Sequence, residues 1–298
     1  MQNNLISTGH RSDPRTLTST LGGVWYGSYG RARCPICGGS KQNPPLSIRR
    51  GHTHLLLKCF KGCAYRDIRD ALSVFGFDDD ALTTADVVRD RHKEDALAQK
   101  KEAQAEACWN EAQPIAGTPA KTYLRRRGIT CDLPDTLRFH SNCWHSGAAR
   151  KLPAMIARID GGERFGIHRT YLTEDGGKAD VEPNKMMLGG ARGGAVRLGE
   201  SVGPLVIGEG IESVLSVLSV LSGSGTLWAA LSTAGLMAVK LPEHRHDLIV
   251  AVDGDRPGRD AGACLARRAT GLGWKVSIAD PGDGYDFNDL LIREVTAW

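Results

Sequence analysis

The sequence predicts an α/β protein with a separate cysteine-bearing segment on its N-terminal side. From Gly203 onward, short runs of Val, Ile, Leu and Ala alternate with helical patterns, which is typical of a largely parallel sheet covered by helices. Residues 84–112 are rich in Ala, Glu, Lys, Arg and Gln and contain no Gly or Pro, and a cluster of four cysteines precedes them. A chain of 298 residues is long enough for about two ordinary domains.

The composition is that of a globular protein, with 24% charged residues and a formal net charge of +4. This basic excess is compatible with a polyanionic partner but is too small to establish one. No apolar run approaches the roughly 18 residues of a membrane span, and the first residues lack the apolar core of a signal peptide. We therefore expect a cytoplasmic protein with no membrane partner.

The clustered cysteines form two short-spaced pairs. They are Cys34, Cys37, Cys59 and Cys63. A short turn lets two thiolates reach one tetrahedral Zn²⁺, and a second pair completes a closed structural site, which we expect to hold one ion. Residues 46–48 and 54–58 predict a hairpin between the pairs, so the segment is interpreted as a zinc ribbon. The other cysteines lie alone in the sequence and are interpreted as small apolar residues. These are Cys108, Cys131, Cys143 and Cys264.

His52 and His54 complicate the ligand set, because imidazole is an equally good zinc ligand. Both lie at the end of the predicted hairpin far from the cysteine pairs, so we assign the site to four cysteines and leave a histidine ligand open. Basic and aromatic residues crowd the same segment, which indicates a surface for single-stranded nucleic acid; a solvated basic face is the alternative. The residues are Arg31, Arg33, Lys41, Arg49, Arg50, Lys58 and Lys61, with Trp25, Tyr26, Tyr29 and Phe60 among them.

The middle of the chain predicts a connecting helix and a basic module. Residues 84–112 predict an exposed helix that joins two modules. A short basic helix over 122–129, ended by Gly128, begins the second module, and strands broken by glycine turns follow from residue 155. We therefore expect four segments: a nucleic-acid-binding ribbon (20–80), a helical linker (81–117), a basic α+β subdomain (118–202) and an α/β domain (203–298).

The last segment alternates strands and helices in order. Strands are predicted around Val206 and over 227–231, 248–252 and 275–279, and helices over 211–221, 259–270 and 288–295. Glu209 follows the first strand, and Asp253 and Asp255 follow the third. In open α/β sheets ligands bind at the carboxyl ends of the strands, and three oxygen donors there suit Mg²⁺. Taken singly, each acid could instead serve a helix N-terminus or a turn.

The strand-Glu-Gly and strand-Asp-Gly-Asp arrangement, followed by Tyr285-Asp-Phe-Asn-Asp-Leu-Leu291, resembles the Toprim domain of bacterial primases, topoisomerases and certain nucleases. The resemblance covers roughly residues 204–294 and implies a Rossmann-like domain. It implies that Glu209, Asp253 and Asp255 hold catalytic Mg²⁺ or Mn²⁺, with Asp286 or Asp289 near the nucleotide or an additional ion. Glu209 is alternatively the base.

The order of segments resembles that in primases of the DnaG type from bacteria and phages. Their zinc domain likewise has a hairpin followed by a cysteine pair that leads into a helix, as residues 59–72 do here. The chain departs in having a cysteine where many members have histidine, and in one extra residue between Cys59 and Cys63. Residues 164–172 and 184–189 resemble the basic motifs of the family. The resemblance implies that Arg169 and Lys185 contact template or incoming triphosphate, with Arg192 and Arg197 assisting.

The resemblance implies a zinc-dependent DNA primase of a phage, plasmid or other mobile element. It would join ribonucleotides into short RNA primers on single-stranded DNA. The implied partners are the template, NTPs and a separate replicative helicase, since the sequence has no G-x-x-x-x-G-K-[ST] motif. A Toprim nuclease and a non-catalytic zinc-ribbon adaptor for single strands remain alternatives. We do not expect a topoisomerase, because the chain leaves no room for a large DNA-gating domain.

Overall fold

The computed structural model describes residues 13–40, 44–51, 55–73, 77, 84–220, 224–243 and 247–296. The chain divides into two compact units, residues 1–96 and 97–298, and each is described by itself. In the described ranges, no helix combines the length and the apolar character that a membrane crossing requires. The predicted α/β class, with a cysteine-bearing hairpin region ahead of a parallel sheet, is confirmed.

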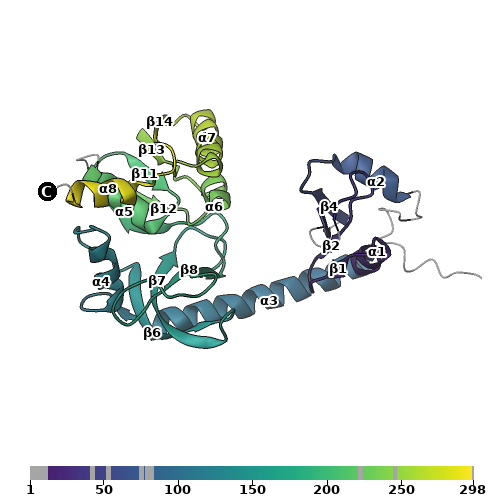
Figure 1. The fold of residues 1–298 in the computed structure, drawn as a ribbon, viewed down its shortest axis with the longest axis horizontal. Helices are drawn as coiled ribbons and strands as arrows, with labels where there is room; N and C mark the ends of the chain where they lie inside the picture. Colours follow the sequence, from purple (N-terminus) through teal and green to yellow (C-terminus); the bar gives the residue numbers. More distant parts are fainter. Residues whose placement is uncertain are drawn as a thin grey trace, which may run out of the picture. The chain divides into compact units, whose positions relative to one another are not determined.

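The first unit is built on a four-stranded antiparallel sheet in the order β1-β2-β3-β4 (Figure 1). The predicted hairpin is present, with Leu46 opposite Cys59, whereas its tip, including His52 and His54, lies outside the described residues. A helix ahead of the sheet was not predicted; its signals are Pro14 at the first position and Asp13, which caps the amide of Thr16 at 2.8 Å. The elements are α1 (Pro14–Thr20), β1 (Val24–Trp25), β2 (Gly30–Ala32), β3 (Leu46–Arg50), β4 (Leu55–Cys59) and α2 (Tyr65–Ser73).

The second unit contains two five-stranded sheets, of which the first is antiparallel in the order β5-β6-β7-β8-β9. Buried residues of α4 (Pro119–Arg126) pack against one face of this sheet and buried residues of α3 (Thr84–Glu111) against the other. The strands are β5 (Gln113–Pro114), β6 (Leu137–His145), β7 (Arg150–Ile159), β8 (Gly166–Tyr171) and β9 (Lys185–Gly189). Successive side chains of a strand point to opposite faces of the sheet. Neighbouring residues of β8 therefore face either the side that α4 covers or the side that α3 covers.

Helix α3 covers the predicted helical stretch, but its last turns are packed rather than exposed. Ala105 and Trp109 are buried against the antiparallel sheet. Glu102 accepts a hydrogen bond from the amide of Phe165 at 2.7 Å and pairs with Arg164 at 3.2 Å. The expectation of an exposed linker therefore fails for these turns, where apolar residues recur at helical spacing within a mostly charged sequence.

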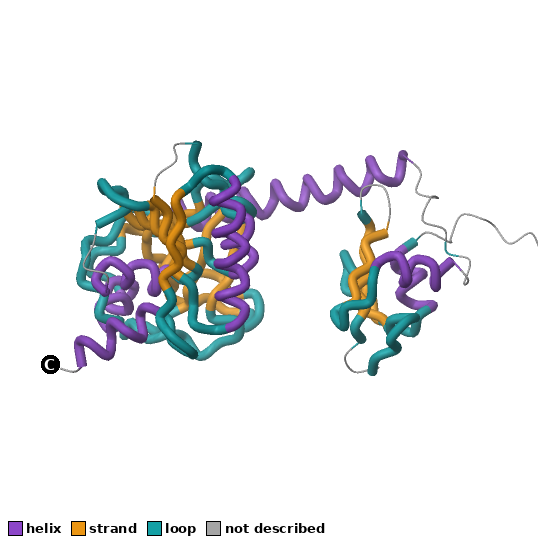
Figure 2. The backbone as a smooth tube through the Cα atoms, turned by 90° about the horizontal axis from the view of Figure 1, so that it is seen from above, coloured by secondary structure: helices purple, strands orange, loops and turns teal. Residues whose placement is uncertain are grey.

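The second sheet has the order β10-β12-β11-β13-β14, in which β10 is antiparallel to β12 and the other neighbours are parallel. Helices α5 and α8 cover one face and α6 and α7 the other. Figure 2 shows helices on both sides of the strands in this part of the chain. The strands are β10 (Val196–Gly199), β11 (Leu205–Gly208), β12 (Thr226–Ala229), β13 (Asp247–Ala251) and β14 (Lys275–Ala279); the helices are α5 (Ile211–Val220), α6 (Thr233–Ala238), α7 (Arg256–Gly271) and α8 (Phe287–Thr296).

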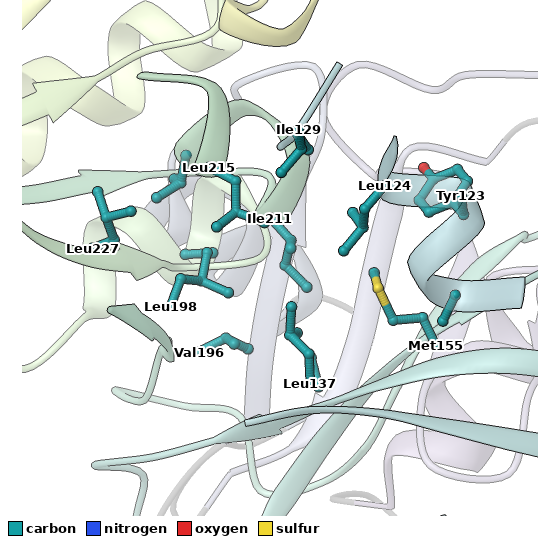
Figure 3. Close-up of a cluster of buried hydrophobic side chains, with 14 of the residues drawn as sticks. Tyr123, Leu124, Ile129, Leu137, Met155, Val196, Leu198, Ile211, Leu215 and Leu227 are labelled. Atoms are coloured by element: carbon teal, nitrogen blue, oxygen red, sulfur yellow. The ribbon is translucent and has the colours of Figure 1, made fainter. Parts of the chain in front are cut away.

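One hydrophobic core joins the antiparallel sheet to the α/β sheet. Figure 3 shows Leu137 of β6 and Met155 of β7 in the same cluster as Val196 of β10 and Ile211 of α5. β10 precedes residue 203 in the sequence yet forms the edge of the α/β sheet. His168 of β8 and Lys185 of β9 line the same cavity as Glu209 and Asp253, which follow β11 and β13, and the candidate site lies there.

Candidate active site and candidate metal centre

A cavity of about 290 Å³ opens at the carboxyl ends of β11 and β13. Glu209 directly follows β11, and Asp253 comes two residues after β13. Asp286 and Asp289, from the start of α8, line the same cavity. The structure therefore brings together acids from three distant parts of the sequence.

Asp286 and Asp289 are held by reciprocal hydrogen bonds. The amide of Asp286 donates to Asp289 Oδ2 at 3.0 Å, and the amide of Asp289 donates to Asp286 Oδ1 at 2.8 Å. This arrangement satisfies free amides in the first turn of α8 and fixes both carboxylates at the cavity.

Asp255 has a different position from the other predicted acids. Its side chain is exposed, is not among the groups that line the cavity, and caps α7 by accepting a hydrogen bond from the amide of Gly258 at 2.7 Å. Its charge still acts on Asp253 and Glu209, whose pKa values it helps to raise.

The carboxylates of the cavity repel one another in a partly desolvated site. Burial, followed by the charges of Asp286 and Asp255, raises the pKa of Asp253 to about 6. Burial and the charges of Asp253 and Asp255 also raise the pKa of Glu209. Asp253 Oδ1 is buried and has no hydrogen-bond partner within the described ranges. A divalent cation would relieve both the repulsion and the unsatisfied oxygen, so these residues fit Mg²⁺ or Mn²⁺.

Basic side chains line the same cavity as the acids: Arg127, Lys178 and Lys185. The carboxylate of Glu212, in the first turn of α5, accepts a hydrogen bond from Lys185 Nζ at 2.9 Å and another from the Tyr123 hydroxyl at 2.6 Å. Arg127 donates to Asn288 Oδ1 at 2.7 Å, and Asn288 Nδ2 donates back to the carbonyl of Arg127 at 2.8 Å. These contacts hold two cations from the antiparallel part against the α/β domain.

His168 is the β8 residue that faces this cavity. Burial, assisted by the charge of Lys185, lowers its pKa to about 4, so the imidazole is neutral near pH 7. Its Nδ1 is buried and has no hydrogen-bond partner in the described part of the chain. It therefore offers a polar ring atom without adding charge to a crowded site.

Four cations were predicted to contact template or triphosphate. Of these, Lys185 lines the acidic cavity, whereas the other three do not. Arg169 follows His168 in β8 and faces the side that α3 covers, where it donates to the carbonyl of Trp144 at 3.2 Å. Arg197, on β10, lies over the ring of Trp228 at 5.2 Å, and Arg192 is exposed in a loop.

Several residues of the cavity were not predicted. Glu212 has the sequence signature of an acid that stabilises a helix N-terminus, and only its burial at 4% exposure reveals another role. Lys178 lies beyond β8 after a glycine turn, and nothing in the sequence connects it to Lys185. Arg127 ends the short helix that was predicted to be basic, which was the available signal.

The four cysteines of the first unit form a compact cluster. Their sulfur atoms all lie within 4.8 Å of one another, and Cys37 Sγ is 3.6 Å from Cys59 Sγ. Tetrahedral Zn–S bonds of about 2.3 Å imply sulfurs about 3.8 Å apart, so the cluster fits a structural zinc ion. Burial opposes ionisation of Cys59, but hydrogen bonds from the amides of Cys63 and Lys61 outweigh it and lower the pKa of Cys59 to about 7.

In the described ranges, the four-cysteine cluster is the one group of three or more Cys, His, Asp or Glu residues whose ligand atoms all lie within 4.8 Å of one another. The acids of the cavity are farther apart. An ion there would need other oxygen donors to complete its shell, as Mg²⁺ sites that bind substrate phosphates usually have.

The predicted nucleic-acid surface of the ribbon centres on Phe60, whose side chain is 58% exposed. The guanidinium carbon of Arg31 lies 4.5 Å from its ring centroid, and Lys58 Nζ lies 5.3 Å from it. A groove of about 510 Å³ beside it is lined by Arg49 and Lys58. Arg50 pairs with Asp13 at 3.7 Å. Exposed aromatic and cationic groups thus share one face of the sheet.

Two family models match the chain. Residues 204–297 match the Toprim domain, which confirms the domain expected from the acids at the strand ends. Residues 99–198 match a domain of unknown function, DUF7146. Curated protein sequences give no match.

Solved primase structures show similarity at low sequence identity. The zinc-binding and RNA polymerase domains of the Aquifex aeolicus primase match at 13% identity over 95% of this chain and 81% of that chain, with a TM-score of 0.41. The RNA polymerase domain of the Mycobacterium tuberculosis primase DnaG matches at 18% identity, over 67% and 79%, with a TM-score of 0.37. The primase fragment of the bacteriophage T7 primase-helicase matches at 14% identity, over 89% and 96%, with a TM-score of 0.32.

Proposed function

We propose that this chain, whose residues 204–297 are a Toprim domain, is a DNA primase that makes short RNA primers on single-stranded DNA. The observation that supports this most strongly is the single cavity that acids and cations line together. Nucleotidyl transfer brings a hydroxyl to the α-phosphorus of a polyanionic nucleotide and releases pyrophosphate. Such a reaction needs carboxylates for metal ions and cations for phosphates in the same small space.

In this proposal Glu209 and Asp253 hold Mg²⁺ or Mn²⁺, with Asp286 and Asp289 placed for an additional ion or for the nucleotide. When bound, the ion would act as a Lewis acid that lowers the pKa of the attacking hydroxyl and neutralises charge on the leaving pyrophosphate. Asp255 contributes negative charge from the rim, with one carboxylate oxygen already engaged in capping α7.

The cations that line the cavity bind the triphosphate in this proposal. Lys185 and Lys178 approach from the antiparallel part of the fold and Arg127 from the end of α4. Burial and the charges of Lys185 and Arg127 lower the pKa of Lys178, which means that they disfavour its charged form. A bound anion between these cations would favour the charged form again. Glu212 orients the Lys185 ammonium through the ion pair, and His168 offers a neutral ring for a hydrogen bond to the nucleotide.

The ribbon is proposed to hold one structural Zn²⁺ through its four cysteines and to bind template through Arg31, Lys58 and Phe60. Stacking of a base on an exposed aromatic ring, with nearby cations for the backbone phosphates, is the usual way to hold a single strand. The proposal includes a separate helicase, a cytoplasmic location and a role in replication of a phage, plasmid or other mobile element.

The test incubates the full chain with a mixed-sequence single-stranded template, labelled NTPs and Mg²⁺ or Mn²⁺. Short template-dependent products are expected, and they should be absent with Asp253→Ala. The matched control is Asp260→Ala, which removes an exposed carboxylate from α7 that pairs with Arg256 at 3.8 Å and should retain activity. Shortening of a labelled template in place of new product would overturn the proposal in favour of a nuclease.

A further inference from the structure

A second cavity, of about 560 Å³, lies on the face of the antiparallel sheet that α3 covers. Two cysteines from distant parts of the sequence line it: Cys108 from α3 and Cys143 from β6. Their sulfur atoms are 3.8 Å apart. Cys143 lies where the pairing of β6 with β7 shifts register, which turns its side chain toward the helix. The two thiols are therefore direct neighbours in a cavity that is separate from the acidic one.

A buried cation adjoins this pair. Arg169 is only 7% exposed, donates hydrogen bonds to the carbonyls of Trp144 and Met187, and keeps a buried Nε without a partner. Within the described residues it forms no ion pair with a carboxylate. A buried guanidinium without a counter-charge is costly. A thiolate on Cys143 would supply the negative charge that Arg169 lacks.

The environment distinguishes the two sulfurs. A hydrogen bond from Cys108, followed by the charges of Arg169 and His140, lowers the pKa of Cys143 to about 6 although burial opposes this. The same hydrogen bond, together with burial, raises the pKa of Cys108. Cys143 is thus the thiolate and Cys108 the neighbouring thiol, which is the usual arrangement of an attacking and a resolving cysteine.

We propose that Cys108 and Cys143 are a modification site, a dithiol that a peroxide such as hydrogen peroxide oxidises reversibly to a disulfide between α3 and β6. The Cys143 thiolate attacks one peroxide oxygen, the O–O bond breaks, and hydroxide leaves, which gives a sulfenic acid. The Cys108 sulfur then attacks the Cys143 sulfur, an S–S bond forms, and the hydroxyl leaves with the thiol proton as water. Two cysteines lose two electrons in total, and the peroxide is reduced to one water and one hydroxide, which takes up a proton from solvent to become the second water.

The disulfide would have a local structural effect. It would cross-link the last turns of α3 to β6, two elements that are also joined by packing of Ala105 and Trp109 on the sheet, by a hydrogen bond from Arg138 to the carbonyl of Trp109 and by the His140–Glu111 contact. It would also remove the thiolate beside Arg169. Cys131 gives the internal comparison, because it is exposed to solvent, yet partial desolvation raises the pKa of its thiol despite the nearby Arg125, which makes it a poorer nucleophile.

The test treats the full, reduced chain with graded hydrogen peroxide, alkylates the remaining thiols and maps the cysteines by mass spectrometry. A peptide cross-linked through Cys108 and Cys143, lighter by two hydrogen atoms, should appear before Cys131 is oxidised and should disappear with dithiothreitol. Cys108→Ser should trap Cys143 as a sulfenic acid that reacts with dimedone. The controls Cys131→Ser and Cys264→Ser should cross-link as the wild type does.

A thermal measurement gives a second readout. The oxidised chain should melt at a higher temperature than the reduced chain, and this difference should vanish in Cys108→Ser. The proposal is overturned if Cys108 and Cys143 stay reduced at peroxide concentrations that oxidise Cys131. Mapping separates this site from the ribbon, since any bond among Cys34, Cys37, Cys59 and Cys63 gives different peptides. None of these outcomes depends on primer synthesis.

Discussion

Lys185 on β9 and Glu212 on α5 form an ion pair with 2.9 Å between Nζ and Oε2. The Glu212 side chain is 6% exposed and that of Lys185 is 34% exposed. Burial opposes the charge on Glu212, but Lys185 and the hydrogen bond from Tyr123 outweigh it and lower the pKa of Glu212 to about 2. Glu212 therefore stays ionised near neutral pH, and the pair joins the two parts of the second unit at the cavity wall.

We expect Glu212→Ala to lower the free energy of unfolding by about 2 kcal/mol, because it leaves the Lys185 ammonium half-buried without its counter-charge. Glu212→Gln should cost less, since the amide oxygen can still accept a hydrogen bond from Tyr123. Urea unfolding of the three proteins measures the difference. If the alanine and glutamine variants were equally stable, the charge on Glu212 would contribute nothing.

The charge on Asp253 is expected to oppose folding in the absence of a metal. Its folded pKa of about 6 lies above the ordinary value of 3.8, so the stability it gives at low pH is lost as pH rises through about 6. Asp253→Asn should therefore melt at a higher temperature than the wild type in EDTA at pH 7.5. Adding Mg²⁺ should raise the melting temperature of the wild type and have little effect on the variant. Equal Mg²⁺ shifts in both proteins would contradict metal binding at Asp253.

Asp255 allows structure and charge to be separated. Asparagine caps a helix about as well as aspartate, so Asp255→Asn should keep α7 intact, whereas Asp255→Ala should lose about 1 kcal/mol of stability. If the negative charge matters for catalysis, the asparagine variant should be as stable as the wild type and still lose most of its primer synthesis. Full primer synthesis by Asp255→Asn would show that the negative charge is dispensable and that Asp255 acts by capping α7 at the amide of Gly258.

His168 makes a testable contribution to the pH dependence of stability. Its folded pKa of about 4 lies below the ordinary value of 6.5, so the unfolded chain binds the proton more readily between these values. Stability should fall as pH decreases from about 6.5 to about 4, by up to about 3 kcal/mol. His168→Gln should remove this component. Asp253 changes the stability in the opposite direction over part of this pH range. The quantity to compare is therefore the difference in free energy of unfolding between the wild type and His168→Gln at each pH.

The strands of the α/β domain were predictable because they are buried on both faces and read as continuous apolar runs, as in residues 205–208. The same logic placed Glu209 and Asp253 at one edge of the sheet. β6 was not predicted, although Leu137 and Phe139 alternate with polar residues, because the exposed Ser141 and Asn142 interrupt the pattern where its pairing with β7 shifts register. On β8 a shift of one residue changes the face, so the choice between His168 and Arg169 depended on packing that no local pattern specifies.

The cysteine cluster should hold the first unit together. The core of that unit is small, and two of its buried members are the ligands Cys34 and Cys59 themselves. We expect about one Zn²⁺ per chain by elemental analysis, lost in Cys34→Ser combined with Cys59→Ser. Because the second unit has its own cores, the variant should lose only the unfolding transition of residues 1–96, whereas residues 97–298 should melt as in the wild type. A metal-free wild type with both transitions unchanged would show that the cluster folds without zinc.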